Sequence, residues 1–183
     1  MKGKNPRKQI ILSISILVSG REETVGKCLD SLETLRRKVP CELILTDTGC
    51  APQLWERLRR RADKVLQFTW CDDFAAARNV GLEAAQGQWF MFMDDDEWFE
   101  STARIEKFFL SGEYRRYESA SYIVRNYNDK AGTCWGDIYL ARLTRRRRET
   151  RFCYRIHESL RPLLAPEKYL DDYVHHYGNI PEA

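Results

Sequence analysis

Four consecutive acidic residues, Asp94 to Glu97, follow a run of five bulky apolar residues. Carboxylates this close repel one another, so placing them at the end of a buried strand costs stability. A hard cation such as Mg²⁺ or Mn²⁺ relieves that cost, most of all when phosphate oxygens also bind it. Because alternate residues of an extended chain face the same way, Asp94 and Asp96 are predicted to point together at a metal. The alternative is a helix N-terminus, where acidic side chains stabilise the dipole, but the preceding strand favours a metal.

Two more polar clusters follow apolar runs. Ser19 to Glu23 comes after the isoleucine-rich run Ile10–Val18, and Asp47-Thr48-Gly49 comes after Glu42–Thr46. In a parallel sheet, ligands bind beyond the carboxyl ends of the strands. The three clusters are therefore predicted to converge on one edge of a sheet. For Asp47 to Gly49, a plain turn is the alternative, since Asp and Gly favour turns for steric reasons.

Strand and helix patterns alternate through the first half of the chain. The expected strands are Ile10–Val18, Glu42–Thr46, Lys64–Phe68 and Trp89–Met93. The expected helices are Val25–Leu35, closed by Pro40, then Leu54–Ala62, and Ala75–Ala85, which Asp72 or Asp73 caps and Gly87 ends. This order predicts an α/β domain, a three-layer sandwich around a largely parallel central sheet.

The second half has a different pattern. Ser101 is expected to cap a helix through Leu110. The expected strands are Tyr122–Tyr127, exposed on alternate residues, then Trp135–Leu143 and Phe152–Ile156, with a hairpin loop at Asn128–Gly132. An antiparallel addition to the sheet, or beside it, is therefore predicted. With 183 residues, the whole chain 1–183 is expected to form a single domain.

Several spaced motifs carry a resemblance to a known family. The segments ISILVSGREETVGKCLDSL, ELILTDTG, DDFAAARNVGLEAAQGQW and FMFMDDDEWF, read in this order, resemble the family 2 glycosyltransferases with the GT-A fold, and most of all their small bacterial members. The resemblance covers Ile10 to about Ser101 closely. It implies a Rossmann-like GT-A fold and transfer of a sugar from a nucleotide sugar, commonly a UDP-sugar, with Mn²⁺ or Mg²⁺. The family usually shows Asn near Gly20, so the first loop of the donor pocket is expected to differ here.

The resemblance also implies roles for individual residues. Asp47 would hydrogen-bond the nucleotide base, and Ser19 and Glu22 would line the same pocket. Arg78 would approach the ribose and phosphates, and the metal–diphosphate would be held by Asp94, Asp95 and Asp96. Residues 1–100 would then bind the donor, and residues 101–183 would face the acceptor. The alternatives are an exposed helix position for Arg78 and a helix-to-loop bridge for Asn79.

The later motifs suggest a base and a further ligand. Arg155-Ile156-His157-Glu158 resembles a downstream segment of the same small members, which makes Glu158 the candidate base for an inverting transfer. The alternative for Glu158 is a salt bridge to a nearby arginine. His157 would position the acceptor or be a buried, hydrogen-bonded histidine. His176 is the candidate metal ligand, with a structural histidine as the alternative.

The charge composition of the chain limits the kinds of binding partner that the sequence predicts. Thirty Lys and Arg against 27 Asp and Glu give a formal charge of +3, so nucleic acid is not expected as a partner. The run Arg145–Arg148 would be a solvated loop or an edge strand, or would face an anionic acceptor or membrane surface. The acceptor is therefore left as a saccharide, a lipid-linked molecule or a protein. A catalytically silent nucleotide-sugar binder and a polyanion-binding domain are the alternatives, and the lack of a Gly-rich triphosphate loop disfavours a nucleotidyltransferase.

The remaining features concern location. Six cysteines without any C-x-x-C pair are expected to be reduced thiols, typical of a cytoplasmic protein. The apolar run near the N-terminus has no cleavage site and is followed by charged residues, and no other run reaches the length of a membrane span. We expect a cytoplasmic protein, with attachment at the inner face of the membrane left open. The segment His176-Tyr177-Gly178-Asn179 resembles the entry to a further segment, so the chain is expected to be one domain of a longer protein or a trimmed family member, without all of the acceptor-binding parts.

Overall fold

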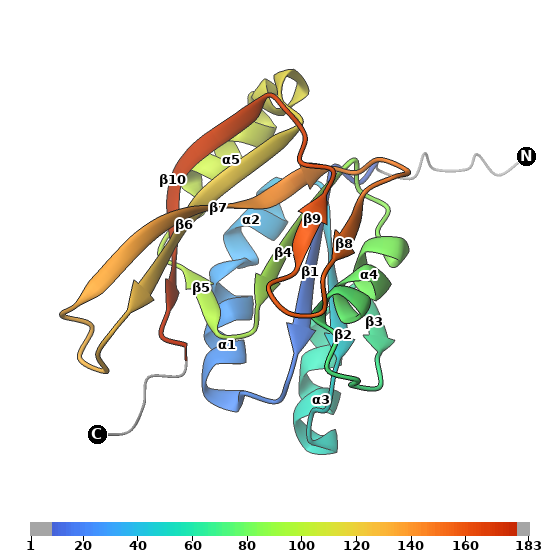
Figure 1. Ribbon diagram of the computed structural model, residues 1–183, viewed down its shortest axis with the longest axis vertical. Coiled ribbons are helices and arrows are strands. Elements are labelled where there is room, and N and C mark those ends of the chain that lie inside the picture. The colour runs from blue at the N-terminus through green and yellow to red at the C-terminus, as the bar shows by residue number, and fades with distance from the viewer. Residues whose placement is uncertain (1–8, 179–183) are drawn as a thin grey trace, which may run out of the picture.

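The computed structural model describes residues 9–178, and the expected entry to a further segment runs into Asn179, outside them. Eight strands form one sheet in the order β3-β2-β1-β4-β7-β6-β10-β5 (Figure 1). A separate two-stranded sheet pairs β8 (Arg151–Cys153) with β9 (Ser159–Arg161). No helix between residues 9 and 178 combines the length and the apolar character needed to cross a bilayer.

The first half of the sheet is parallel, as predicted. It consists of β1 (Leu12–Val18), β2 (Cys41–Asp47), β3 (Lys64–Gln67) and β4 (Trp89–Asp94). All seven residues of β1 are buried, because helices or loops cover both faces of this central strand. The carboxyl ends of the four strands therefore lie at one edge of the sheet.

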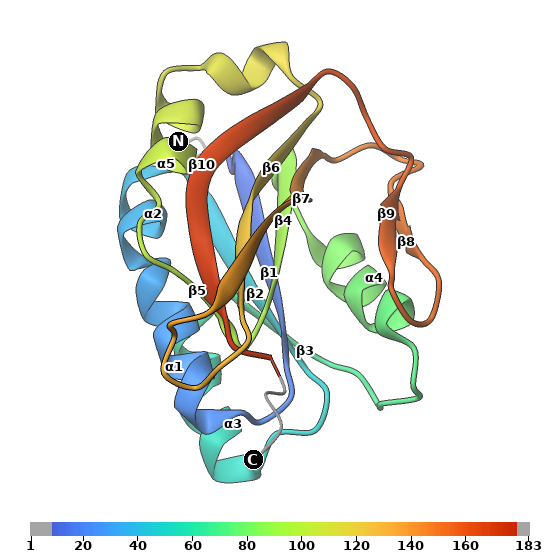
Figure 2. The ribbon, with the colours of Figure 1, turned by 60° about the vertical axis from the view of Figure 1, so that its left-hand side comes forward.

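Two layers cover the sheet (Figure 2). On one face lie α1 (Glu22–Ser31), α2 (Glu33–Lys38), α3 (Pro52–Leu58) and α5 (Ala103–Leu110), which share a core with the even-numbered residues of β1. On the other face lie α4 (Phe74–Ala84) and the β8–β9 sheet, which pack against Ile44, Phe90 and Phe92. Short 3₁₀ helices, η1 (Arg59–Arg61) and η2 (Glu113–Arg116), complete the helical elements of residues 9–178. The predicted three-layer α/β fold is confirmed.

The second half of the sheet is mixed. β7 (Trp135–Arg145) is antiparallel to β4 and to β6 (Ser119–Tyr127), which confirms the predicted antiparallel addition to the same sheet. Beyond them, β10 (Glu167–His176) runs parallel to β6, and the edge strand β5 (Glu97–Phe99) is antiparallel to β10. Neither β5 nor β10 was expected as a strand.

Several local predictions were wrong. The helix expected over Val25–Leu35 divides at Leu32 into α1 and α2, and Leu54–Ala62 is helical only as α3 followed by η1. The strand expected to alternate like an exposed one over Tyr122–Tyr127 begins at Ser119 and has no exposed residue. Tyr122 is fully buried, and its hydroxyl donates to the carbonyl of Phe92 at 3.4 Å. The strand expected over Phe152–Ile156 stops at Cys153, because Tyr154 has a φ of 74°.

Helix ends show which side chains satisfy the free backbone groups. Of the two proposed caps for α4, the structure uses Asp73, which accepts the N–H of Ala76 at 2.9 Å. At α5, Ser101 accepts from Ala103, but the buried carboxylate of Asp172 in β10 accepts the next two N–H groups at 3.1 and 2.7 Å. A residue from the far end of the chain therefore stabilises the start of α5.

Gly87 does not end α4, whose last residue is Ala84. A Cβ at Gly87 would instead lie 2.5 Å from the backbone nitrogen of Ser13, so glycine permits close approach of the chain to β1. Ser13 donates to the buried carboxylate of Glu42 at 2.6 Å and accepts from the N–H of Gly87 at 2.8 Å. Glu42 also accepts from the N–H of Gln86 and pairs with Lys64 at 3.0 Å. This polar network joins β1, β2 and β3 at their amino-terminal ends.

Candidate functional site

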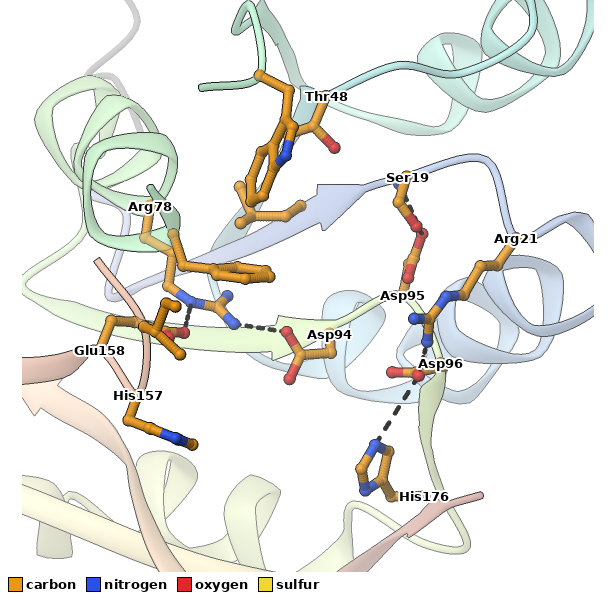
Figure 3. A pocket seen from close by; sticks show the side chains of 14 residues that line it. Ser19, Arg21, Thr48, Arg78, Asp94, Asp95, Asp96, His157, Glu158 and His176 are labelled. Carbon is orange, nitrogen blue, oxygen red and sulfur yellow. Dashed lines mark hydrogen bonds and ion pairs between the residues drawn. The ribbon is translucent and has the colours of Figure 1, made fainter. Parts of the chain in front are cut away.

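A cleft of about 520 Å³ opens at the carboxyl ends of β1, β2 and β4. Ten polar residues that line it are labelled in Figure 3: Ser19, Arg21, Thr48, Arg78, Asp94, Asp95, Asp96, His157, Glu158 and His176. Each of the three polar clusters contributes at least one of these side chains. The convergence predicted from strand order is therefore what the structure shows.

Asp94 at the end of β4 is held by two arginines. Its oxygens accept from Arg78 at 2.5 Å and from Arg142 at 3.3 Å. Burial alone would raise the pKa of Asp94, but the two guanidinium groups outweigh it and hold that pKa well below its ordinary value. Asp94 is therefore ionised and already paired within the protein.

Arg78 reaches this position because α4 packs closely on the sheet. The small residues Ala75 and Ala77 are buried there, and Arg78 itself is only 3% exposed. Its Nε donates to Glu158 at 2.6 Å, so one guanidinium joins Glu158 to Asp94 (Figure 3). The salt bridge considered as the alternative for Glu158 is thus present, and Glu158 also lines the cleft. The exposed-helix alternative for Arg78 is wrong.

The next two acids face different partners. Asp95 accepts from the backbone N–H of Ser19 at 2.7 Å and from its hydroxyl at 3.0 Å, which ties the end of β1 to the end of β4. Burial raises the pKa of Asp95, and these two hydrogen bonds oppose the rise. Asp96 pairs with Arg21 and faces His176, whose Nε2 lies 3.8 Å from Oδ2 of Asp96.

The orientation of His176 is fixed by a strand neighbour. Its Nδ1 lies 2.7 Å from the side-chain oxygen of Asn126, which can only accept, so Nδ1 carries the proton. Burial lowers the pKa of His176, and the neutral form leaves an Nε2 lone pair directed towards Asp96. A second partner that fixes the tautomer is the usual arrangement for a metal-binding histidine.

The donor set fits a divalent ion in part. Asp96 and His176 present an oxygen and a neutral nitrogen that can share one cation with phosphate oxygens. The oxygens of Asp94 are bound to Arg78 and Arg142 instead. No group of three His, Cys, Asp or Glu side chains arranged to bind a metal occurs in residues 9–178. Asp96, which pairs with Arg21, lies beside His176, whereas both oxygens of Asp94 are paired with arginines. Asp94, Asp96 and His176 as metal ligands all stay predictions.

Other predicted residues lie at the margin. One oxygen of Asp47 accepts the N–H groups of Gly49 and Cys50, so Asp47 shapes the loop while Thr48 lines the cleft. Glu22 is exposed in the first turn of α1, pairs with Arg57, and borders a neighbouring groove of about 280 Å³. The roles of Asp47 and Glu22 in base binding stay predictions.

Two smaller predictions have a clear outcome. His157 is exposed at the cleft with a φ of 57°, so the buried alternative for it is wrong. Asn79 bridges α4 and β8 through two hydrogen bonds to the backbone of Phe152, at 3.0 and 2.9 Å. Asn79 therefore bridges the helix to a strand, and not to a loop as the alternative predicts.

Arg142, like Arg21, is a charged residue of this region for which the sequence predicts no role. It is buried in β7, donates to Glu97 at 2.7 Å, and reaches Asp94. Burial raises the pKa of Glu97 to about 7, although the charge of Arg142 opposes the rise. The sequence signal for this buried arginine is its place within the apolar segment Leu140–Leu143, where a charged side chain is unusual.

The basic run Arg145–Arg148 is not a free patch. Arg145 donates to the carbonyls of Tyr114, Arg115 and Tyr117, and Arg146 donates to the carbonyl of Gly87. Arg145 and Arg147 also pair with Glu118. Three of the four arginines thus satisfy neighbouring groups of the fold, which disfavours the polyanion-binding alternative.

Comparison with known proteins agrees with this architecture. Residues 13–162 match the family model of glycosyl transferase family 2. A TPR repeat-containing protein of Synechococcus elongatus is 31% identical over 147 residues, which cover 80% of this chain and 34% of that protein. The chain thus spans about a third of the length of this relative.

Solved structures show the same fold. The crystal structure of S. aureus TarS 1-349 in complex with UDP-GlcNAc has a TM-score of 0.54 and 19% identity, covering 66% of this chain and 36% of that one. The crystal structure of S. aureus TarS 1-349 in complex with UDP has a TM-score of 0.52 and 18% identity, and the match covers 66% of this chain and 37% of that one. These likenesses support the GT-A fold. Since the family model matches most of the chain, this protein belongs to glycosyl transferase family 2.

Proposed function

We propose that this chain transfers a sugar from a nucleoside-diphosphate sugar to an acceptor hydroxyl, and that UDP-sugars are its donors. The observation that carries the proposal is the cleft, where Asp96 and His176 lie on one side and the Arg78–Glu158 pair on the other. Such a cleft offers ligands for a diphosphate-bound cation and a carboxylate that can accept a proton. The TarS structures bound to UDP and UDP-GlcNAc support this choice of donor through the shared fold.

The donor is proposed to lie across the carboxyl ends of the parallel strands. The base would lie at the end of β2, near Asp47 and Thr48, with Ser19 and Glu22 at the end of β1. A divalent ion held by Asp96 and His176, with Asp94 as the predicted further ligand, would supply neutralising charge to the departing diphosphate. Arg78 adds a fixed positive charge beside Asp94 and needs no rearrangement to do so.

Glu158 is the proposed general base. The acceptor oxygen forms a bond to the anomeric carbon while the bond from that carbon to the diphosphate breaks, and the acceptor proton moves to the Glu158 carboxylate. Attack from the face opposite the diphosphate inverts the anomeric carbon. The ion pair with Arg78 at 2.6 Å keeps the Glu158 carboxylate in one position, which favours proton transfer in a fixed geometry.

A catalytically silent nucleotide-sugar-binding domain is the second candidate. The observation that favours it is the same ion pair, because a carboxylate bound to a buried guanidinium also has a purely structural use. The two candidates agree on donor binding and differ on turnover.

The experiment that tests the proposal is calorimetric titration of UDP in the presence and absence of Mn²⁺. We expect metal-dependent binding in the wild type and a loss of at least ~10-fold in affinity for Asp96→Ala, because the substitution removes a metal ligand. Asp30→Ala is the matched control, since Asp30 also pairs with an arginine but lies on the exposed side of α1. A UDP affinity that changes neither with Mn²⁺ nor with the Asp96→Ala substitution would contradict the proposed position of the donor site. Release of UDP from a panel of UDP-sugars then measures turnover.

A further inference from the structure

Arg21 occupies the turn between β1 and α1, where its backbone is fixed. The preceding Gly20 has a φ of 98°, which favours glycine, and the carbonyl of Arg21 accepts the N–H groups of Thr24 and Val25 at 3.2 and 3.0 Å. The side chain of Arg21 is 45% exposed. Its guanidinium is therefore the part of the residue that is able to change partners.

The guanidinium contacts the carboxylate oxygen that also faces the histidine. Arg21 Nη1 pairs with Oδ2 of Asp96, and Nε2 of His176 lies 3.8 Å from the same Oδ2 (Figure 3). Among residues 9–178, Asp96 is the single ion-pair partner of Arg21. A protein cation thus occupies the oxygen at which the proposed ion would bind.

The two arginines that pair with Asp94, Arg78 and Arg142, differ from Arg21 in burial. The side chains of Arg78 and Arg142 are 4% and 10% exposed, and each bridges two carboxylates. Removing either guanidinium would leave one largely buried carboxylate, Glu158 or Glu97, without its cation, which is strongly destabilising. Arg21 has one carboxylate partner and direct contact with solvent, so its ion pair is the one that can open at low cost.

We propose that Arg21 is an exchangeable cation that competes with the divalent ion for Asp96 and so sets the metal requirement of the site. The inference rests on the proposed function, because the ion in question is the one that would accompany the donor. It concerns a residue of the β1–α1 turn that carries no role in the transfer scheme.

The physical reason is exclusion at one oxygen. The guanidinium contacts Oδ2 of Asp96, and an ion shared between Asp96 and His176 would bind that same oxygen, because it is the one that Nε2 of His176 faces. Two cations at contact distance repel each other. Binding of the ion therefore requires the Arg21 side chain to move into solvent, and the lost ion pair lowers the affinity for the ion. Without the guanidinium, Asp96 and His176 would be open to the ion from the start.

The test measures binding of Mn²⁺ alone, without nucleotide or turnover, by the electron paramagnetic resonance signal of free Mn²⁺. We expect Arg21→Ala to bind Mn²⁺ about tenfold more tightly than the wild type. Arg21→Lys keeps a cation at this position and is expected to stay nearer to the wild type. Arg59→Ala is the matched control, because Arg59 is 47% exposed and also has one acidic partner, yet lies in η1 away from the cleft.

The outcomes separate this inference from the donor site. Tighter Mn²⁺ binding in Arg21→Ala but not in Arg59→Ala supports it, and an added Asp96→Asn substitution should abolish the gain. Unchanged or weaker binding in folded Arg21→Ala overturns it, as does an equal gain in Arg59→Ala, which would indicate a general effect of charge. UDP binding is measured separately, so an intact donor site with an unchanged Mn²⁺ affinity would contradict only the role of Arg21.

Discussion

The parallel half of the sheet and the second half of the chain supply the cleft in different ways. In the parallel half, β1, β2 and β4 end at the same edge, so Ser19, Thr48 and Asp94 meet through strand order alone. The second half of the chain reaches the cleft through separate contacts, namely Glu158, which pairs with Arg78, and His176, which Asn126 of β6 orients.

This difference predicts which residues can be substituted without disturbing the positions of their neighbours. Residues at the parallel edge are held by backbone pairing, so a substitution there changes ligand contacts more than it changes position. The second-half residues depend on individual ion pairs and hydrogen bonds. Loss of one partner therefore misplaces or destabilises a specific group, and the largest effects on chemistry and stability are expected there.

The largest effect is expected at Glu158, the proposed contribution of the second half to chemistry. Glu158→Gln keeps an oxygen near Nε of Arg78 but removes the base, so the transfer rate should fall by about 10²- to 10⁴-fold. The affinity for UDP should stay within about twofold. Initial rates at saturating donor and calorimetry measure the two quantities.

Glu113→Gln is the control for Glu158, since Glu113 also pairs with a cation but lies in η2 and lines no part of the cleft. If the transfer rate of Glu158→Gln stayed within about tenfold of the wild-type rate, Glu158 would not be the general base. Tight UDP binding with no turnover in the wild type would instead favour the silent binder.

The next effect tests whether the second half stabilises the acidic edge. Arg142→Met leaves Glu97 and one side of Asp94 without their cation, so the free energy of unfolding should fall by about 3–5 kcal/mol. Urea denaturation followed by circular dichroism measures the change. Arg147→Met, which removes an exposed pair with Glu118, should cost less than about 1 kcal/mol. Equal losses in the two variants would erase the distinction between buried and exposed arginines.

The smallest effect concerns the contact of β10 with α5. Asp172→Ala removes the carboxylate that accepts two N–H groups at the start of α5, and thermal unfolding should show a loss of about 1–2 kcal/mol. The neighbouring Asp171 is exposed and accepts from the hydroxyl of Tyr139, so Asp171→Ala is a close control with little expected effect. If both substitutions behaved alike, capping from β10 would not stabilise α5.

Sequence patterns predicted the parallel half well. Continuous apolar runs such as Ile10–Val18 and Trp89–Met93 are typical of strands buried on both faces, and the polar clusters after them mark their carboxyl ends. The edge at which Asp94 to Asp96 gather follows from that order, so both the fold class and the position of the cleft could be predicted.

The second half could not be predicted as fully, for physical reasons. β10 alternates inward and outward residues, but its inward Asp172 caps a helix, so it does not read as an apolar position. Arg142 and His176 have partners distant in sequence, and single-residue propensity carries no information about them. In the turn at Tyr154 and His157, two residues other than glycine have a positive φ, and no local sequence pattern predicts this conformation.

The hydrogen-bond network of Ser13, Glu42 and Gly87 has a consequence for sequence variation. It fixes the register of β1 against β2, and with Lys64 also β3, at the end of the sheet opposite the cleft. A one-residue slip would turn every side chain of a strand to the wrong face, and this network resists it. Loops at the cleft can therefore lengthen, shorten or change composition while the strands keep their alignment. New ligand preferences can arise on this scaffold without a new fold.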